Sequence, residues 1–352
     1  MTLIDETRSS ITPVDPSVAA TTQRLLDSKT KPRRSLGRLE DLACRVAAIR
    51  GTATPGLPKK AIVVMGADHG VADEGVSAYP QAVTRQMLLN FAAGGAAINV
   101  LARHAGAQVV VVDMGVKEPL PAPSAIRVER IAAGTRNLSR EAAMSRTQAV
   151  TAIETGIRLA RELAADGVTL IGIGEMGIAN TTAASALTAA FTGAAPEAST
   201  GRGTGVDDDG LQRKIDVVKR ALAVNRPDPT DPLDVLAKLG GFEIAGLAGV
   251  VLGSAARRVP VVVDGFIAGV SALAAVRLAP SASGYLIAAH QSVEVGHRLV
   301  LEALDARPLL GLELRLGEGT GAALAMSLVD AALRVLHEMA TFEAAGVSDS
   351  GA

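Results

Sequence analysis

The chain has 352 residues, of which 48% are apolar, and at about 100–200 residues per domain this length suits two domains or one large one. Its 35 basic and 36 acidic side chains give a formal charge of -1 and only 2% of residues are aromatic, which argues against a nucleic-acid-binding protein because neither a basic groove nor stacking platforms are available. Cys44 is the only cysteine, so an intramolecular disulfide is excluded and a thiolate metal site is not supported.

The start of the chain and its most apolar segments predict a soluble, cytoplasmic protein. Asp5 and Glu6 stand where a secretory signal would need a basic start followed by an apolar run. The stretches from Gly246 to Ala256 and from Thr320 to Val329 are shorter than the roughly 20 apolar residues that a membrane span requires. We therefore expect no membrane partner.

Helices are predicted at both ends of the chain. Apolar residues recur at helical spacing from Val18 to Leu26 and from Leu36 to Ile49, and Lys29-Thr-Lys-Pro-Arg-Arg34 joins the two segments. The stretch from Gly321 to Met339 has the same spacing. We expect these end segments to pack together.

Six β-branched or apolar runs, each followed by glycines and polar residues, predict six strands. They are Ala61 to Met65, Val109 to Val112, Val168 to Ile173, Val261 to Val263, Tyr285 to Ile287 and Leu312 to Leu316. Because most alternate with helical patterns, we expect an α/β fold with a mostly parallel, Rossmann-like sheet whose site lies past the strands' carboxyl ends. The catalytic α/β domain is expected over residues 59–320, with a smaller helical domain from residues 1–58 and 321–352.

The segment Gly172-Ile-Gly174-Glu-Met-Gly177 lies between a predicted strand and a predicted helix, the setting of a dinucleotide-binding fingerprint. A nicotinamide-dependent oxidoreductase is therefore one alternative. Against it, Glu175 places a carboxylate where it would repel a pyrophosphate, and this strand is the third in the chain instead of the first. A tight turn that lets helix meet strand is the simpler interpretation.

The glycine-rich loop Ser199-Thr-Gly-Arg-Gly-Thr-Gly205 suits a phosphate. Glycines let backbone N–H groups approach an anion, and Lys214 or Arg202 can add a charged hydrogen bond. Asp207-Asp-Asp209 is interpreted as the start of a helix, where acidic residues complement the dipole.

Two further segments carry polar groups past predicted strands. His69, in Asp68-His-Gly70, has no second His or Cys at metal-ligand spacing, so we interpret it as a structural histidine. In Gly317-Glu-Gly-Thr-Gly321 one carboxylate is flanked by glycines, so Glu318 is a candidate general base. A helix cap in a non-catalytic nucleotide-binding protein is the alternative role for Glu318.

Six motifs together carry a family resemblance. They are Ala67-Asp-His-Gly-Val-Ala-Asp-Glu-Gly-Val-Ser77, Asn90-Phe-Ala-Ala-Gly-Gly-Ala-Ala-Ile98, Gly174-Glu-Met-Gly-Ile-Ala-Asn-Thr-Thr182, Gly201-Arg-Gly-Thr-Gly205, Val263-Asp-Gly-Phe266 and Gly317-Glu-Gly-Thr-Gly321. In these the chain resembles the nicotinate-nucleotide:dimethylbenzimidazole phosphoribosyltransferases, from about Thr30 to about Met339. It departs from them at Arg33-Arg34, where the family usually has Pro-Gly.

The resemblance implies transfer of 5-phosphoribose from nicotinate mononucleotide to 5,6-dimethylbenzimidazole, giving α-ribazole 5'-phosphate and nicotinate for the lower ligand of cobalamin. It implies inversion at C1', Glu318 as the general base, no cofactor, no metal and a homodimer. The substrate-binding residues that it implies are Ser77, Tyr79, Gln86 and Leu316 at the benzimidazole, Glu175 and Asp264 near the ribose, Lys214 and Ser292 at the phosphate, and Gly177, Asn180, Thr181, Gly201, Arg202, Gly203, Thr204, Gly265 and Phe266 elsewhere in the site.

Overall fold

The computed structural model describes residues 2–121, 125–203 and 205–348, and within these ranges six strands form one parallel sheet in the order β3-β2-β1-β4-β5-β6. The strands are β1 (Lys60–Ala67), β2 (Ala107–Gly115), β3 (Arg127–Val128), β4 (Leu170–Met176), β5 (Val261–Val263) and β6 (Leu286–Ala288). The predicted α/β class with a Rossmann-like sheet is confirmed. The order reverses at β1, so the loops that leave β1 and β4 border the crevice where such sheets bind ligands.

The register of the central strands aligns their carboxyl ends. Gly66 on β1 pairs with Asp113 on β2 and with Met176 on β4. The polar segments that begin with Asp68 and Gly177 therefore leave the sheet at the same level, as expected for parallel strands.

Five of the six predicted strands lie on observed strands, but the prediction for Leu312 to Leu316 is wrong. Leu312 and Leu316 are 52% and 58% exposed, and Glu313 has a φ of 55°, which no regular strand contains. The alternation of Leu with charged residues looks like a strand, yet this segment runs along the loop that follows β6, where the Val293 amide donates to the Leu314 carbonyl at 3.3 Å. The sixth strand is β3, which is too short for a periodic signal.

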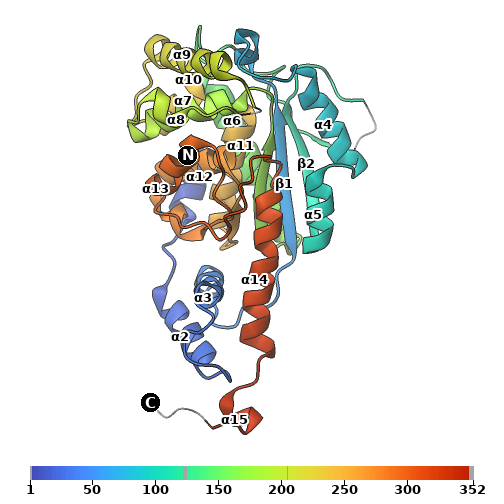
Figure 1. Ribbon diagram of the computed structural model, residues 1–352, viewed down its shortest axis with the longest axis vertical. Helices are drawn as coiled ribbons and strands as arrows, with labels where there is room; N and C mark the ends of the chain where they lie inside the picture. Colours follow the sequence, from blue (N-terminus) through green and yellow to red (C-terminus); the bar gives the residue numbers. More distant parts are fainter. Residues whose placement is uncertain (1, 122–124, 204, 349–352) are drawn as a thin grey trace.

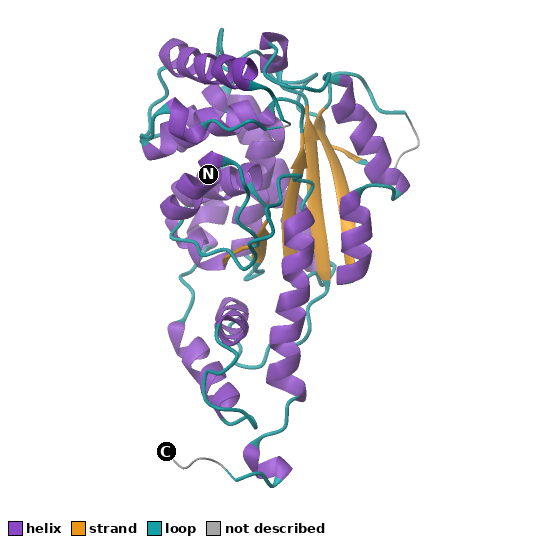
Figure 2. Ribbon diagram, viewed as in Figure 1, coloured by secondary structure: helices purple, strands orange, loops and turns teal. Residues whose placement is uncertain are grey.

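Helices cover both faces of the sheet (Figures 1 and 2). Alternate β1 residues point to opposite faces: Val63 belongs to the core cluster that includes residues of α6, α7, α11 and α12, and Val64 belongs to the cluster that includes residues of α3, α4, α5 and α14. The helices are α1 (Leu3–Ser10), α2 (Pro16–Asp27), α3 (Arg38–Arg50), α4 (Ala82–Ala93), α5 (Ala97–Ala105), α6 (Arg146–Ala165), α7 (Asn180–Thr192), α8 (Pro196–Ser199), α9 (Asp208–Asn225), α10 (Pro232–Leu239), α11 (Phe242–Ala255), α12 (Phe266–Leu278), α13 (Val295–Ala303), α14 (Thr320–Glu338) and α15 (Phe342–Ala345), with 3-10 helices η1 (Gly70–Glu74) and η2 (Pro280–Tyr285). Among the helices of the described ranges, none combines the length and hydrophobicity that a membrane crossing requires.

The predicted end helices are observed as α2, α3 and α14, and they pack together at one end of the elongated molecule (Figure 1). The Thr30 amide donates to the Ala340 carbonyl at 3.0 Å, which ties the two ends of the chain together. Helix α1, which the sequence did not predict, lies elsewhere: Ile4 and Ile11 join the core beside α6 and α11. We propose the same division into an α/β domain and a smaller helical domain, except that α1 belongs to the α/β domain.

The loop between α2 and α3 is held by a buried ion pair. Lys31 Nζ lies 2.8 Å from Glu40 Oε1, which also accepts from the Leu36 amide at 3.0 Å. Arg34 has a φ of 58°, a left-handed conformation that favours glycine. The departure from the family's usual Pro-Gly therefore places a large side chain where a glycine would be unstrained.

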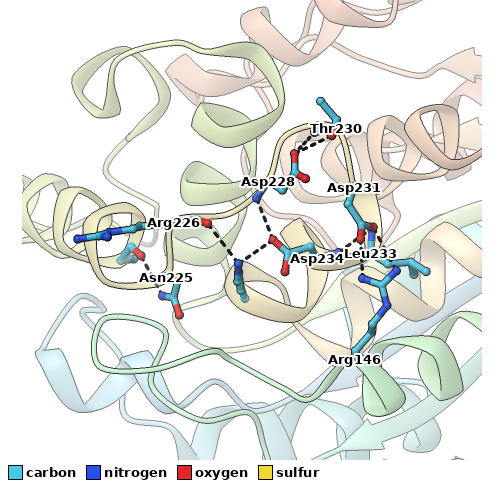
Figure 3. A network of polar contacts seen from close by, with 10 residues as sticks. Arg146, Asn225, Arg226, Asp228, Thr230, Asp231, Leu233 and Asp234 are labelled. Carbon is cyan, nitrogen blue, oxygen red and sulfur yellow. Dashed lines mark hydrogen bonds and ion pairs between the residues drawn. The ribbon is translucent and has the colours of Figure 1, made fainter.

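A polar network joins α9, α10 and α6 (Figure 3). Asp231 caps α10 by accepting from the amides of Leu233 and Asp234 at 3.1 and 3.2 Å, and it also accepts from Arg146 on α6 at 2.6 Å. Lys238 bridges Asp234 and the carbonyl of Arg226, just past α9. This network attaches the C-terminal end of α9 to α10.

Candidate active site

A cleft of about 110 Å3 lies past the carboxyl ends of β4, β5 and β6. Clefts in this position are typical of small-molecule sites in α/β proteins. Nine of the predicted site residues line it: Glu175, Gly177, Asn180, Thr181, Gly203, Gly265, Phe266, Ser292 and Leu316. The first and the last of these residues, Glu175 and Leu316, lie about 140 positions apart in sequence. The fold therefore gathers half of the predicted site residues into one cleft.

Glu318 is buried in a left-handed turn beside this cleft. Gly317, Glu318 and Gly319 have φ values of 86°, 64° and 89°, so the turn is favourable for the two glycines and strained for the glutamate. Glu318 Oε2 accepts from the amide of Ile98, in the first turn of α5, at 3.3 Å. Burial raises the pKa of Glu318, and this hydrogen bond opposes the rise.

The turn can approach β4 because residue 174 is glycine. A Cβ on Gly174 would lie 2.3 Å from the Gly319 nitrogen and 2.4 Å from the Glu318 carbonyl carbon. The hydrogen bond of the Glu318 carboxylate does not match the predicted alternative of a cap on the helix that follows it: Glu318 precedes the N-cap residue of α14, Gly319, and its Oε2 accepts from the Ile98 amide. The carboxylate contacts α5 instead.

Glu175 lies on the floor of the cleft at the end of β4. Its Oε2 accepts from Asn180 Nδ2 at 2.5 Å. Burial raises its pKa to about 8, and the nearby carboxyls of Glu243, Asp264 and Glu318 act in the same direction. The side chain is therefore largely protonated at neutral pH in the free protein, and a cationic ligand would favour its ionised form.

Asp264 lies below the cleft and does not line it. Its Oδ2 accepts from the Gly319 amide at 3.0 Å and its Oδ1 from the Ala322 amide at 3.1 Å, so both oxygens face the start of α14. Burial raises the pKa of Asp264 to about 7, and the bonds to the backbone amides oppose this shift. The predicted ribose contact would need a different side-chain orientation.

Lys214, on α9, is buried at the glycine-rich side of the cleft. Its Nζ donates to Thr181 Oγ1 at 2.9 Å, and a Cβ on Gly203 would lie 2.8 Å from that nitrogen. Burial lowers the pKa of Lys214 to about 8, although nearby Glu294 favours its charged form. An anion in the cleft would stabilise the ammonium further.

The other predicted residues of the glycine-rich loop behave differently. Arg202 is exposed and pairs with Asp208 and the Val206 carbonyl instead of facing the cleft. Gly201 is buried close to Glu294 Oε2, and Thr204 lies outside the described residues. Asp207 caps α9 by accepting from the amide of residue 210 at 2.8 Å, so the interpretation of the aspartates as a helix start is confirmed.

Ser292 is held by two neighbours. Its amide donates to Nδ1 of His297 at 2.9 Å, and its hydroxyl accepts from the Glu294 amide at 3.3 Å. Burial lowers the pKa of His297 to about 3, so this imidazole is neutral and can accept. The Ser292 hydroxyl, rather than its amide, is therefore the group left for a ligand.

Three predicted acceptor-site residues lie outside this cleft. Tyr79 is 55% exposed and Gln86 is exposed on α4, while Ser77 lies in the loop between η1 and α4. That loop is held near α9, because Arg213 donates to the Gly75 carbonyl at 3.1 Å. The structure brings the loop close to the lysine helix without turning these side chains into the cleft.

Two of the lining residues that sequence analysis missed are His290 and Arg315. His290 follows the predicted strand from Tyr285 to Ile287 and stands beside Gln291 and Ser292, so its position past a strand could have indicated a site residue. Arg315 lies in the segment wrongly predicted as a strand, so no signal would have placed it here.

His69 is a structural histidine, as predicted. Its Nε2 lies 2.6 Å from Glu243 Oε1, and both side chains are fully buried. Within the described ranges, no group of three or more His, Cys, Asp or Glu side chains is arranged to hold a metal ion.

Comparisons with known proteins identify relatives over the whole chain. A family model described as Phosphoribosyltransferase matches residues 11–347. The nicotinate-nucleotide–dimethylbenzimidazole phosphoribosyltransferase of Geobacter metallireducens is 57% identical over 347 residues, covering 99% of this chain and 98% of that protein, and the enzyme of the same name from Chloroflexus aggregans is 58% identical over 349 residues, covering 99% of each. A crystal structure of CobT from Thermus thermophilus superposes with a TM-score of 0.91 at 50% identity, covering 95% of this chain and 100% of that one.

Proposed function

This chain belongs to the nicotinate-nucleotide–dimethylbenzimidazole phosphoribosyltransferase family and is a phosphoribosyltransferase, and from that premise we propose that it transfers 5-phosphoribose from nicotinate mononucleotide to 5,6-dimethylbenzimidazole. The products are α-ribazole 5'-phosphate and nicotinate. The observation that supports this reaction best is a single cleft that places a buried lysine near glycines and a buried carboxylate, Glu318, beside the same space.

The chemistry needs one base and no activating group. Nicotinate in its mononucleotide is a quaternary pyridinium, so when its bond to C1' breaks the electron pair returns to the pyridinium nitrogen and a neutral ring leaves. One nitrogen of the benzimidazole attacks C1' from the opposite side, which inverts that carbon, and the other ring nitrogen loses its proton. We assign that proton to Glu318, whose pKa burial has raised toward the range useful for a base.

The buried carboxyl of Glu175 suits the donor's positive charge. A pyridinium, or the cationic ribose that develops as it leaves, would favour the ionised form of a group that is largely protonated in the free protein. The ionised Glu175 would then place its negative charge next to the positive charge that develops on the ribose. This role is independent of the base at Glu318.

Replacing Lys214 with Ala is expected to weaken binding of nicotinate mononucleotide. We expect a KM for this donor about 10- to 100-fold higher and a smaller change in kcat, because a phosphate far from C1' is held alike in the ground state and the transition state. Steady-state kinetics with varied donor measure the effect. Arg202→Ala is the matched control, because that exposed cation faces Asp208 and not the cleft, and it should leave KM within about twofold. A Lys214→Ala enzyme that lost kcat and kept its donor KM would contradict the phosphate assignment.

The proposed function itself is tested by one incubation. Purified protein with nicotinate mononucleotide and dimethylbenzimidazole, in excess EDTA, should form ribazole phosphate detectable by mass, because the leaving group carries its own charge and needs no cation to neutralise it. Activity that vanished with EDTA and returned with magnesium would indicate a diphosphate donor. Hydride transfer to a nicotinamide cofactor, or binding without turnover, would favour the oxidoreductase or the non-catalytic alternative.

We also propose a homodimer. Exposed apolar side chains lie on the segments that border the cleft: Leu316 lines it, Val293 stands between the lining residues Ser292 and Glu294, and Leu312 precedes Leu316 in the segment that is hydrogen-bonded to Val293. A second copy of the chain would cover such a surface. Light scattering from the purified protein measures the mass of the assembly.

A further inference from the structure

Asp264 is a buried carboxylate whose hydrogen bonds to described residues lead to the segment that carries Glu318, while His290 Nε2 lies 3.6 Å from its Oδ1. It follows β5 and lies more than 50 positions from the turn in sequence, yet its two oxygens accept from the amides of Gly319 and Ala322 at 3.0 and 3.1 Å. The Asp264 side chain therefore supplies the cap that Gly319, the N-cap residue of α14, cannot provide. One of the two bonded amides belongs to the residue next to Glu318.

The Glu318 turn needs such an anchor. A left-handed φ of 64° costs free energy for a residue other than glycine, so this conformation persists only where its surroundings hold it. On one side the turn packs directly against the backbone of Gly174, and the Glu318 amide donates to the Glu175 carbonyl at 3.3 Å. Asp264 holds the other side together with His290, since a Cβ on Gly321 would lie 2.8 Å from Asp264 Oδ1 and would also meet the His290 ring.

The geometry points to Asp264 as a positioning residue that acts through Glu318: by binding the Gly319 and Ala322 amides it holds the strained turn so that the Glu318 carboxylate faces the acceptor. This inference rests on the proposed function, in which Glu318 is the base. It assigns Asp264 no contact with the ribose, which agrees with its place below the cleft. Because a displacement of about 1 Å in a catalytic group can cost about 100-fold in rate, the loss of this anchor should be visible in kcat.

A double-mutant cycle separates action through Glu318 from direct action on the substrate. Asp264→Asn keeps the shape of the side chain and one acceptor oxygen. Its NH2 group, however, then faces a backbone N–H and cannot accept a hydrogen bond from it. We expect kcat to fall about 10- to 100-fold with both KM values within about threefold, and Asp264→Ala to be slower still. In the Glu318→Gln background the same Asp264→Asn change should cost less than about threefold, because no base is left to position.

Asp231→Asn is the matched control. Asp231 also caps a helix through two backbone amides, at the start of α10 (Figure 3), and it does not line the cleft. Both Asn variants are expected to lower the melting temperature, and only Asp264→Asn should lower kcat. An equal fall of kcat in Asp231→Asn would reduce the role of Asp264 to general stability.

The remaining outcomes distinguish this inference from the function on which it rests. If the effects of Asp264→Asn and Glu318→Gln multiply, or if Asp264→Asn raises the donor KM strongly, Asp264 acts on the substrate and the inference is overturned while the function stands. If Glu318→Gln is fully active, the base assignment falls and the inference falls with it. If the unmodified protein forms no ribazole phosphate, the proposed function is wrong.

Discussion

Glu318→Gln is expected to fold normally and to lose turnover by about 100- to 10,000-fold, the usual cost of removing a general base. The amide keeps the size of the side chain, and its oxygen can still accept from the Ile98 amide, so the turn should stay in place. It cannot take the proton that the benzimidazole must lose. Single-turnover formation of ribazole phosphate, followed by mass, measures the loss without interference from product release.

The pH dependence gives a second measure of the same group. A base works in its ionised form, so kcat/KM should fall as pH drops through the pKa of Glu318, and burial places that fall at a higher pH than for an ordinary glutamate. The fall assigned to Glu318 should be absent from the Gln variant. Glu313→Gln, on the exposed segment just before the turn, is the matched control and should keep both the rate and the profile of the unmodified enzyme. Near-normal turnover in Glu318→Gln would leave that carboxylate with only its structural bond to α5.

Gly156→Ala is expected to destabilise the fold by about 3 kcal/mol or more, a large share of the roughly 5–15 kcal/mol that holds a typical domain together. Gly156 lies where α6 crosses α11, and a Cβ there would stand 1.8 Å from the Gly246 carbonyl oxygen and 2.7 Å from the Val250 nitrogen. Both obstacles are backbone atoms, so no side chain can rotate away and the helices must separate. The better helix propensity of Ala offsets only about 1 kcal/mol of this cost.

Urea unfolding followed by circular dichroism measures this change, and Gly253→Ala is the control on the same helix pair. There the added Cβ would lie 2.8 Å from the Ile157 carbonyl oxygen and 2.9 Å from the Ala160 Cβ, a shallower overlap than at Gly156, so we expect a smaller loss of stability. Comparable losses in the two variants would show that the depth of the overlap is not what limits the approach of α6 and α11.

Local patterns in the sequence were sufficient for the class of fold and for the family. Apolar runs such as Ala61 to Met65 that alternate with helical patterns are typical of a parallel sheet buried on both faces, and glycines mark where such strands end. The α/β class and most strand positions therefore followed from residues close together in the chain. The glycine-rich motifs around Glu175 and Glu318 carried the resemblance that the family comparisons confirm. The roles given to individual site residues remain predictions.

Only the tertiary structure decided which groups these residues meet. Glu318 accepts from an amide 220 positions away, and Asp264 turns from the cleft to the start of α14, because packing around the sheet places these groups together and burial requires that each finds a partner. Leu312 to Leu316 has a strand's alternation but lies along the loop after β6, outside the ladder of strand pairs. The sequence by itself determined the elements and the chemical groups, because these depend on neighbours along the chain. The orientation of each group depends on contacts between distant segments, which local patterns do not encode.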